Sequence, residues 1–338
     1  SNSSAKEIDI NSTDALVSGT IKSDLVDVNT SNDTEIKNAK VSALTEGNDG
    51  LLDVETEGNI DISNSEVNVI NTFKADEDVS VANSTFTTDL NVDKSNNTNI
   101  TGDLTIEGEA IVSAENKLNI NNATIDIDNI LSNTDVDITS TTVKGDLNVT
   151  TDKNITISDA NIKKDLNATA ENINIFEMLL EGNINTYVDN LNLKTSNDLH
   201  LGKIQGNSSQ YTNNAIIESA QNITNGLSAN DKNIYAVNAN LKAGNSIGTN
   251  GKSVNIAASN GNVISIDAQK TASLDTTGSK ANYNKFSAEE TILKTDEDIK
   301  ISDLNTDKLT INTSSSNVDI TGSIGTEGTI KTADTPCT

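Results

Sequence analysis

A short phrase of one aliphatic, one polar and one aliphatic residue returns about every 19 residues through the first half of this chain. It occurs at Ile60/Ile62, Val79/Val81, Leu118/Ile120, Val136/Ile138, Ile155/Ile157 and Ile173/Ile175, with Ile100 marking the copy between the second and third. A fixed period of this length is typical of a stacked repeat, in which each copy can bury its apolar side only against its neighbours. The chain is therefore predicted to fold as a solenoid.

Two further aliphatic series run in step with the first. The second series holds Leu52/Val54, Phe73, Leu90/Val92, Leu147/Val149 and Leu166/Ala168, and the third holds Val67/Val69, Phe86, Leu104/Ile106, Ile125/Ile127, Val143 and Ile162. The phrases alternate with period two, and they are too short and too rich in β-branched residues for helices. The sequence thus predicts an all-β, parallel β-helix with three short strands and three corners per rung of about 19 residues.

The corner before the first series is the most regular in sequence. It reads E-T-E-G-N before Ile60, K-A-D-E-D before Val79 and T-T-D-K-N before Ile155. Gly, Asn and Asp at a constant offset favour a tight turn, because Asn and Asp bond their own backbone and tolerate left-handed angles. The same corner is predicted in K-T-S-N-D before Leu199 and in K-T-D-E-D before Ile299.

These repeats predict one continuous rod with three regions. Residues 1–201 form regular rungs, residues 202–251 a β-helix with an irregular loop or insertion, and residues 252–338 a continuing β-helix with a flexible C-terminal tail. The aliphatic side chains of one rung gain less on burial than ordering the rung costs. Since asparagine is about one residue in seven, we expect stacked Asn or Thr columns to add stability.

The rhythm loosens between Gly202 and Gly251. Ile216, Ile217, Ala220, Ile223 and Leu227 could belong to a short amphipathic helix, but strands interrupted by one surface loop are favoured, because Asn222, Asn225 and Gly226 interrupt a helix. A long loop on the side of a solenoid is where binding is usually placed. The alternative is a simple insertion without a binding role.

The segment L-K-A-G-N-S-I-G-T-N-G-K-S-V-N-I-A-A-S-N-G-N-V-I-S-I, residues 241–266, resembles the repeats of filamentous-haemagglutinin-type adhesins. These adhesins are exported by two-partner secretion or as autotransporter passengers. The matching strand and turn positions are Leu241, Ala243, Gly244, Ile247, Gly248, Thr249, Val254 and Ile256. The resemblance implies a right-handed parallel β-helix, export through an outer-membrane transporter of a Gram-negative cell, and a role in attachment. The family's secretion-directing N-terminal domain is not recognisable in this sequence.

Charge and composition exclude several classes of function. The chain has 50 acidic residues and 23 basic ones, all of them Lys, and a net charge of -27. Such a charge repels phosphate backbones and anionic membrane surfaces, so nucleic-acid binding is excluded. A single cysteine, Cys337, allows no internal disulfide or cysteine metal cluster. The sequence shows no membrane-spanning run or signal region, and its Ser-Asn start suggests a fragment of a larger protein.

No residue pattern points to catalysis or a cofactor. His200 stands between Leu199 and Leu201, which predicts that it points outward, and there is no second His to join it in a metal site or triad. The acid clusters Asp76–Asp78 and Asp296–Asp298 are expected to be solvated corners, with weak calcium binding as the alternative. Outward acids such as Asp53, Asp61 and Asp137 lack the Arg or Trp that carbohydrate-active β-helices commonly add. The mixed column of residues between the first-series aliphatics argues against ice binding.

The leading hypothesis is a noncatalytic fragment of a large adhesin, at the surface of a Gram-negative cell or secreted from it. It would serve as a β-helical stalk or as a binding region for a host or surface glycan or protein, alongside other segments of the same adhesin. The alternatives are a structural fibre or biofilm-matrix component and, third, a carbohydrate-active enzyme. Tyr211, Tyr235 and Tyr283 are the candidate binding residues, because an exposed aromatic on a polar surface is a common contact for sugars and proteins.

Overall fold

The computed structural model describes residues 2–228, 231–314 and 317–332. The chain divides into two compact units, Ser1–Lys164 and Asp165–Thr338, which we call unit 1 and unit 2. Every regular element among the described residues is a β-strand, and the strands pair in parallel with strands of the neighbouring rung. The predicted all-β, parallel solenoid is therefore confirmed. The continuity of a single rod and its right-handed sense stay predictions.

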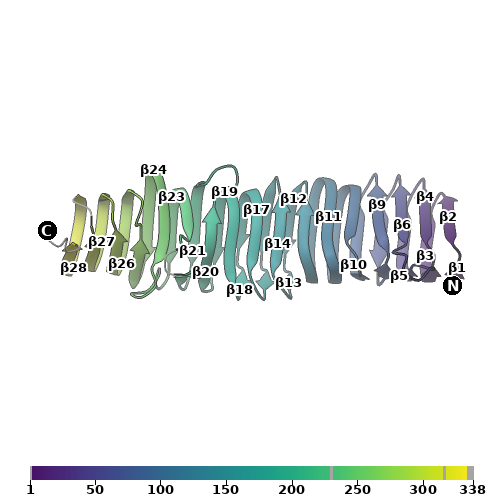
Figure 1. Cartoon of the computed structure of the whole chain (residues 1–338), viewed down its shortest axis with the longest axis horizontal. Coiled ribbons are helices and arrows are strands. Elements are labelled where there is room, and N and C mark those ends of the chain that lie inside the picture. The colour runs from purple at the N-terminus through teal and green to yellow at the C-terminus, as the bar shows by residue number, and fades with distance from the viewer. Residues whose placement is uncertain (1, 229–230, 315–316, 333–338) are drawn as a thin grey trace. The chain divides into compact units, whose positions relative to one another are not determined.

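Unit 1 is a stack of rungs whose strands lie side by side in Figure 1. Its strands are β1 (Ser3–Ser4), β2 (Glu7–Ser12), β3 (Ala15–Lys22), β4 (Leu25–Thr30), β5 (Thr34–Ser42), β6 (Leu51–Thr56), β7 (Ile60–Ser63), β8 (Glu66–Asn68), β9 (Ile70–Ala75), β10 (Val79–Phe86), β11 (Leu90–Ser132), β12 (Asp135–Thr139), β13 (Thr142–Val143), β14 (Leu147–Thr151), β15 (Asn154–Ser158) and β16 (Asn161–Ile162). The long β11 follows the coil through several corners, and its backbone is left-handed at Gly102 and Asn122.

The first aliphatic series forms a single file in unit 1. Val81 pairs with Ile62 on one side and with Ile100 on the other. Ile138 pairs in the same way with Ile120 and Ile157. All six side chains are at most 1% exposed, so the residues predicted to point inward do fill the interior.

The second and third series line the interior as well. Phe73 pairs with Val54 and Val92 in the second file, and Phe86 pairs with Val67 and Ile106 in the third. The rings of Phe73 and Phe86 meet edge to face, with their centroids 6.4 Å apart. Because the two rings come from different strands of the coil, this contact ties two walls of the core together.

Most left-handed residues of unit 1 gather at the corner that follows the first series. Eight of them lie two residues after the first-series phrase, namely Gly19, Asn38, Asn64, Asn83, Gly102, Asn122, Ser140 and Asp159, with φ between 48° and 83°; Gly47 and Gly50 lie in the loop between β5 and β6. Among the described residues of unit 1, none with positive φ lies in the corner before the first series. The bends at residues 57–58, 76–77 and 152–153 agree with the predicted turn before the first series, and the left-handed residues mark the next corner.

The corner before the first series is built instead on a file of side-chain acceptors. Asp33 Oδ1 accepts the backbone N–H of Asn59 at 2.8 Å, and Asn59 Oδ1 accepts the N–H of Asp78 at 3.1 Å. Asp78 Oδ1 then accepts both the N–H and the side-chain amide of Asn97, at 3.0 and 2.9 Å. These bonds satisfy corner amides that the strands leave unpaired.

Unit 2 has the same architecture with longer rungs in its middle. Its strands are β17 (Leu166–Phe176), β18 (Leu179–Leu180), β19 (Asn183–Thr195), β20 (Leu199–Gln205), β21 (Thr212–Ser219), β22 (Ile223–Asn225), β23 (Ile234–Ala243), β24 (Val254–Ala268), β25 (Thr271–Asp275), β26 (Ala281–Thr295), β27 (Ile299–Thr313) and β28 (Val318–Thr332). Ile216 and Ile217 lie in β21 and Ile223 in β22, so this stretch forms strands rather than the alternative helix.

A continuous asparagine ladder runs along one side of unit 2. The side-chain amide of Asn190 donates to Asn172 at 2.9 Å, that of Asn214 to Asn190 at 2.8 Å, and that of Asn238 to Asn214 at 3.1 Å. Each bond joins equivalent positions of two rungs, and the sequence separation grows from 18 to 24 residues along the ladder. The predicted stacked Asn columns are therefore present.

The K-T-S-N-D corner before Leu199 does not occupy the predicted place. Leu193 pairs with Ile175 of the first series, so this corner follows the first series and does not precede it. Leu201 pairs with Ile184, which itself pairs with Leu166 of the second series. The error has a physical reason, because the same turn residues satisfy more than one of the three corners, and only strand register tells the corners apart.

Candidate functional site

A surface loop between β20 and β21 carries one of the predicted tyrosines. The loop, residues 206–211, is fastened to Asp189 of the preceding rung. Asp189 Oδ1 accepts the backbone N–H groups of Asn207 and Ser208 at 3.2 and 3.0 Å, and Oδ2 accepts the Ser208 hydroxyl at 2.7 Å. The bonds from Ser208 hold the pKa of Asp189 below its ordinary value. The loop is therefore fixed in place at neutral pH.

Tyr211, at the end of this loop, packs against Tyr235 of β23. Their ring centroids are 6.2 Å apart and the rings meet at 63°. The Nζ of Lys203 lies 5.5 Å from the centroid of Tyr235, a cation–π contact. Both tyrosines are partly exposed and Lys203 is exposed. We call Tyr211, Tyr235 and Lys203 the tyrosine cluster.

A fourth tyrosine, Tyr187, was absent from the predicted set. It is 45% exposed and points outward from β19, where it pairs with Gln205 of β20. Ile204, the residue before Gln205, pairs with Ile234, the residue before Tyr235. Gln205 and Tyr235 therefore occupy equivalent positions on neighbouring rungs. Tyr187 and Tyr235 thus stand about 10 Å apart on the same outward column. The alternation of Ile184, Thr186 and Val188 around it could have identified its outward direction.

Tyr283 lies in the core and away from the cluster. It is 1% exposed, and its ring packs against Phe286 with centroids 5.2 Å apart. Burial raises the pKa of its hydroxyl. A ring without exposed surface cannot contact a ligand at the protein surface, so the candidate site holds Tyr211 and Tyr235 but not Tyr283.

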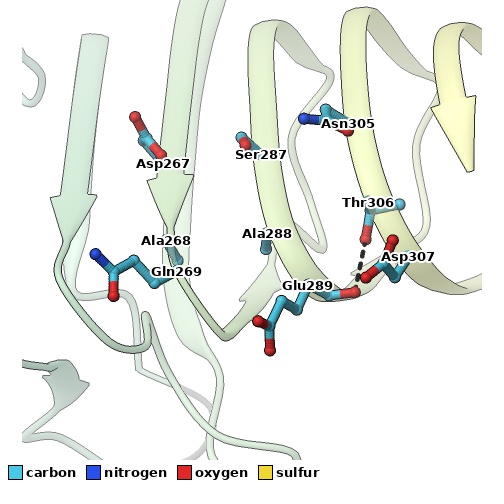
Figure 2. A pocket seen from close by; sticks show the side chains of 9 residues that line it. All are labelled: Asp267, Ala268, Gln269, Ser287, Ala288, Glu289, Asn305, Thr306 and Asp307. Atoms are coloured by element: carbon cyan, nitrogen blue, oxygen red, sulfur yellow. Dashed lines mark hydrogen bonds between the residues drawn. The ribbon is translucent and has the colours of Figure 1, made fainter. Parts of the chain in front are cut away.

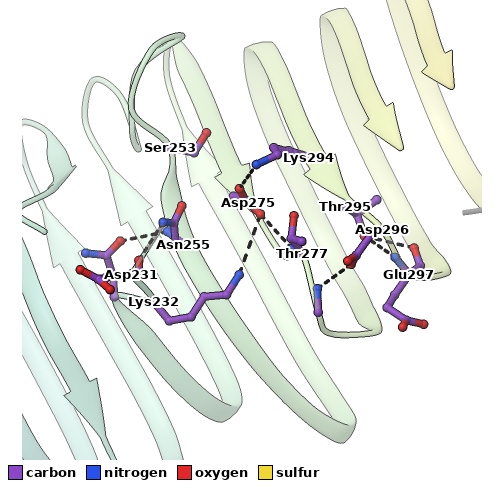
Figure 3. A network of polar contacts seen from close by, with 12 residues as sticks. Asp231, Lys232, Ser253, Asn255, Asp275, Thr277, Lys294, Thr295, Asp296 and Glu297 are labelled. Atoms are coloured by element: carbon purple, nitrogen blue, oxygen red, sulfur yellow. Dashed lines mark hydrogen bonds and ion pairs between the residues drawn. The ribbon is translucent and has the colours of Figure 1, made fainter. Parts of the chain in front are cut away.

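A polar network with a buried carboxylate, Asp275, lies at β25 in unit 2 (Figure 3). Asp275 Oδ2 lies 2.9 Å from the Nζ of Lys294, and Oδ1 lies 3.9 Å from the Nζ of Lys232. Burial acts to raise the pKa of Asp275, but the bonds from Thr277 and Lys294 outweigh it and the pKa is lowered. Burial also lowers the pKa of Lys232. Because the carboxylate is paired on both sides, the network fastens the segment that carries Lys232 to the solenoid.

A shallow groove crosses three rungs of unit 2 (Figure 2). Its lining forms successive rows in which Asp267 pairs with Ser287, Ser287 with Asn305, and Ala288 with Thr306. Glu289 and Asp307 line one margin. The groove has carboxylates but none of its nine lining residues is aromatic or basic. It thus lacks the sugar-stacking ring that would accompany a carbohydrate-active site.

The two acid clusters have structural partners. Asp76 pairs with Lys94, and Asp78 belongs to the acceptor file of unit 1. Asp296 Oδ1 accepts the N–H of Gly278 at 2.5 Å, and Asp298 lies 3.8 Å from Lys280. Within the described ranges, no three His, Cys, Asp or Glu side chains gather in a group that could hold a metal ion. Calcium binding stays an untested alternative.

His200 and Cys337 are the two remaining residues that the sequence singled out. His200 is exposed between buried Leu199 and Leu201, as predicted, and its Nδ1 lies 2.6 Å from the Thr224 hydroxyl. Cys337 lies outside the described residues. No helix long and apolar enough to cross a membrane occurs in the part of the chain that the structure describes.

Comparison of the chain with protein-family models, with curated proteins and with solved structures finds no match. The fold and the tyrosine cluster therefore have to support the functional argument by themselves.

Proposed function

We propose that this chain is a noncatalytic part of a large extracellular adhesin, and that the tyrosine cluster contacts a glycan or protein on the target surface. The location would be the surface of a Gram-negative cell or the surrounding medium, reached through an outer-membrane transporter. The parallel solenoid is compatible with this function, as is the resemblance of residues 241–266 to haemagglutinin-type repeats.

The observation that carries the proposal is the rigid presentation of two tyrosines that contact each other at the surface of unit 2. The chain has only eight Phe and Tyr residues and no Trp, and Phe73, Phe86, Phe286 and Tyr283 are in the core. Tyr211 and Tyr235 remain accessible, and the Asp189 contacts hold the loop that presents the first of them. Tyrosines offer a large contact area at low conformational cost, which is why they are enriched at binding surfaces.

A noncatalytic role is part of the proposal. Acid–base catalysis on a polysaccharide needs two carboxylates placed about the scissile bond, and a platform for the sugar ring. The acidic groove of Figure 2 and the tyrosine cluster are formed by different residues. We therefore assign the aromatic surface to binding alone.

Binding of the labelled chain to cultured epithelial cells and to a glycan array tests the proposal. The variant Tyr211→Ala/Tyr235→Ala is compared with Phe176→Ala, which removes an aromatic ring that is 41% exposed elsewhere on unit 2. We expect saturable binding by the parent chain and by Phe176→Ala. The double variant should bind at least about tenfold more weakly, because two central aromatic contacts are lost.

Circular dichroism spectra and melting curves show whether both variants keep the fold. Equal weakening by the two variants would contradict the assignment of the site. End-to-end polymers without saturable binding would favour the structural fibre. Polysaccharide cleavage that disappears in Glu289→Gln/Asp307→Asn would favour the enzyme.

A further inference from the structure

An aliphatic column stands on the outer surface of unit 1. Leu25, Leu51 and Ile70 occupy equivalent positions of β4, β6 and β9, where Leu25 pairs with Leu51 and Leu51 with Ile70. The three strands are neighbours in Figure 1. Ile70 is 50% exposed, and the two leucines are partly exposed. The three paired side chains thus place a continuous aliphatic column on the outer face of these strands.

A column of aspartates runs beside the aliphatic column. Asp27 and Asp53 follow Leu25 and Leu51 by two residues, so they lie on the same face of the same strands. Asp27 pairs with Asp9 on one side and with Asp53 on the other. Neighbouring rungs bring equivalent side chains to within about 5 Å, so these like charges repel one another.

Asp53 has Lys74 as a counter-charge, but it shares that lysine with Asp93. Its Oδ1 is buried and has no hydrogen-bond partner. Burial raises its pKa, the charges of Asp27, Glu55 and Asp93 add to that effect, and Lys74 opposes it. Lys74 itself lies 3.9 Å from Asp93. A cation placed over the column would relieve the repulsion.

A fixed loop borders the aliphatic column. The segment 43–50 between β5 and β6 is fastened to Asp24, whose Oδ1 accepts the N–H groups of Leu44 and Thr45 at 3.1 and 2.8 Å. The Thr45 hydroxyl donates to Oδ2 at 2.5 Å. Leu44 is 40% exposed on this loop and adds a fourth aliphatic side chain to the region. The arrangement repeats the contact of Asp189 with the loop that carries Tyr211.

We propose that the outer face of β4, β6 and β9 binds an extended peptide segment in which an aliphatic residue and a lysine or arginine alternate two residues apart. Alternate side chains of an extended peptide are about 7 Å apart, which is also the spacing between the aliphatic and the aspartate columns. The aliphatic side chain would cover Leu51 and Ile70, and the cation would lie over Asp27 and Asp53.

Charge decides between this partner and a second copy of the chain. The chain carries a net charge of -27 and has no arginine, so two copies repel each other at long range. A basic aliphatic segment is attracted by the same field and also covers the exposed apolar column. The proposal concerns unit 1 and is independent of the tyrosine cluster.

Fluorescence anisotropy with a defined probe tests the proposal. The probe is a fluorescein-labelled octapeptide that alternates threonine with isoleucine and lysine, and its control has glutamate in place of lysine. The variants Asp27→Asn/Asp53→Asn and Ile70→Ser should each raise the dissociation constant of the lysine probe at least about fivefold. The parent chain should not bind the glutamate probe.

Matched controls separate this face from the overall charge. Asp61→Asn/Asp126→Asn removes two exposed acids elsewhere on unit 1, and Leu16→Ser removes an aliphatic side chain that is 62% exposed. These controls should change the dissociation constant less than about twofold. Equal weakening by control and test variants, or no binding of the lysine probe, would overturn the proposal. So would sedimentation that shows self-association abolished by Ile70→Ser. Melting curves check that each variant is folded.

Discussion

Glu177 occupies a left-handed position that suits glycine, and replacing it should stabilise unit 2. Its φ is 52°, and it stands two residues after Ile175, the place that Gly19 and Gly102 hold in unit 1. The left-handed conformation destabilises a residue that has a Cβ by about 1–2 kcal/mol. Glycine avoids this strain, but it loses about 0.5–1 kcal/mol because its unfolded chain has more conformational freedom. Glu177→Gly should therefore raise the free energy of unfolding by about 0.5–1 kcal/mol.

Two control variants isolate the backbone effect. The N–H of Glu177 donates to the carbonyl of Lys194 at 2.9 Å, a bond that the glycine variant keeps. Glu177→Ala removes the same charge but keeps the Cβ, so it should bring little of the gain. Glu171→Gly removes an exposed glutamate from the extended backbone of β17 and should lower the free energy of unfolding by about 0.5–1 kcal/mol.

Urea unfolding followed by circular dichroism measures the change. A stack of repeats need not unfold in one step. Hydrogen exchange of peptides from residues 166–195 should therefore show whether the change in stability lies in these rungs. Slower exchange there in Glu177→Gly, and faster exchange in Glu171→Gly, is the expected result. If both glycine variants lower the stability equally, the reasoning from the left-handed corner is wrong.

Two further predictions concern the polar columns. Asn190→Ala removes two bonds from the middle of the asparagine ladder and should cost about 1–2 kcal/mol in urea unfolding. Asn192→Ala on the same strand should change the stability by less than about 0.5 kcal/mol, and equal losses would refute a role for the ladder. Burial raises the pKa of Asp53 in the folded chain. The contribution of Asp53 to stability therefore falls as the pH rises from the ordinary pKa of the unfolded chain through the raised pKa of the folded chain. Asp53→Asn should therefore be more stable than the parent at pH 7 and should lose this advantage at acid pH, as melting at several pH values would show. An advantage that persists unchanged at low pH would argue against repulsion in the aspartate column.

The functional region was only partly accessible from the sequence. The rarity of aromatic residues directed attention to Tyr211 and Tyr235, which do come together although 24 residues separate them. Tyr283 followed from the same reasoning and is buried, because it occupies an inward position between Ile264 and Ile301. Asp53 was identified as an outward acid, but the aliphatic column of Leu51 and Ile70 beside it was not recognised, because only strand register shows which outward residues are stacked.

The sequence by itself determined the kind of fold, because alternation within each phrase and the period of about 19 residues leave few other ways to bury the aliphatic side chains. It also determined that polar ladders would accompany the stack. Only the tertiary structure decided which corner is left-handed, where the K-T-S-N-D turn lies, and which tyrosines meet. The physical reason is register, since ladder bonds in unit 2 span first 18 and then 24 residues. A column can no longer be followed by counting once rung length varies, and strand pairing alone then sets which side chains are neighbours.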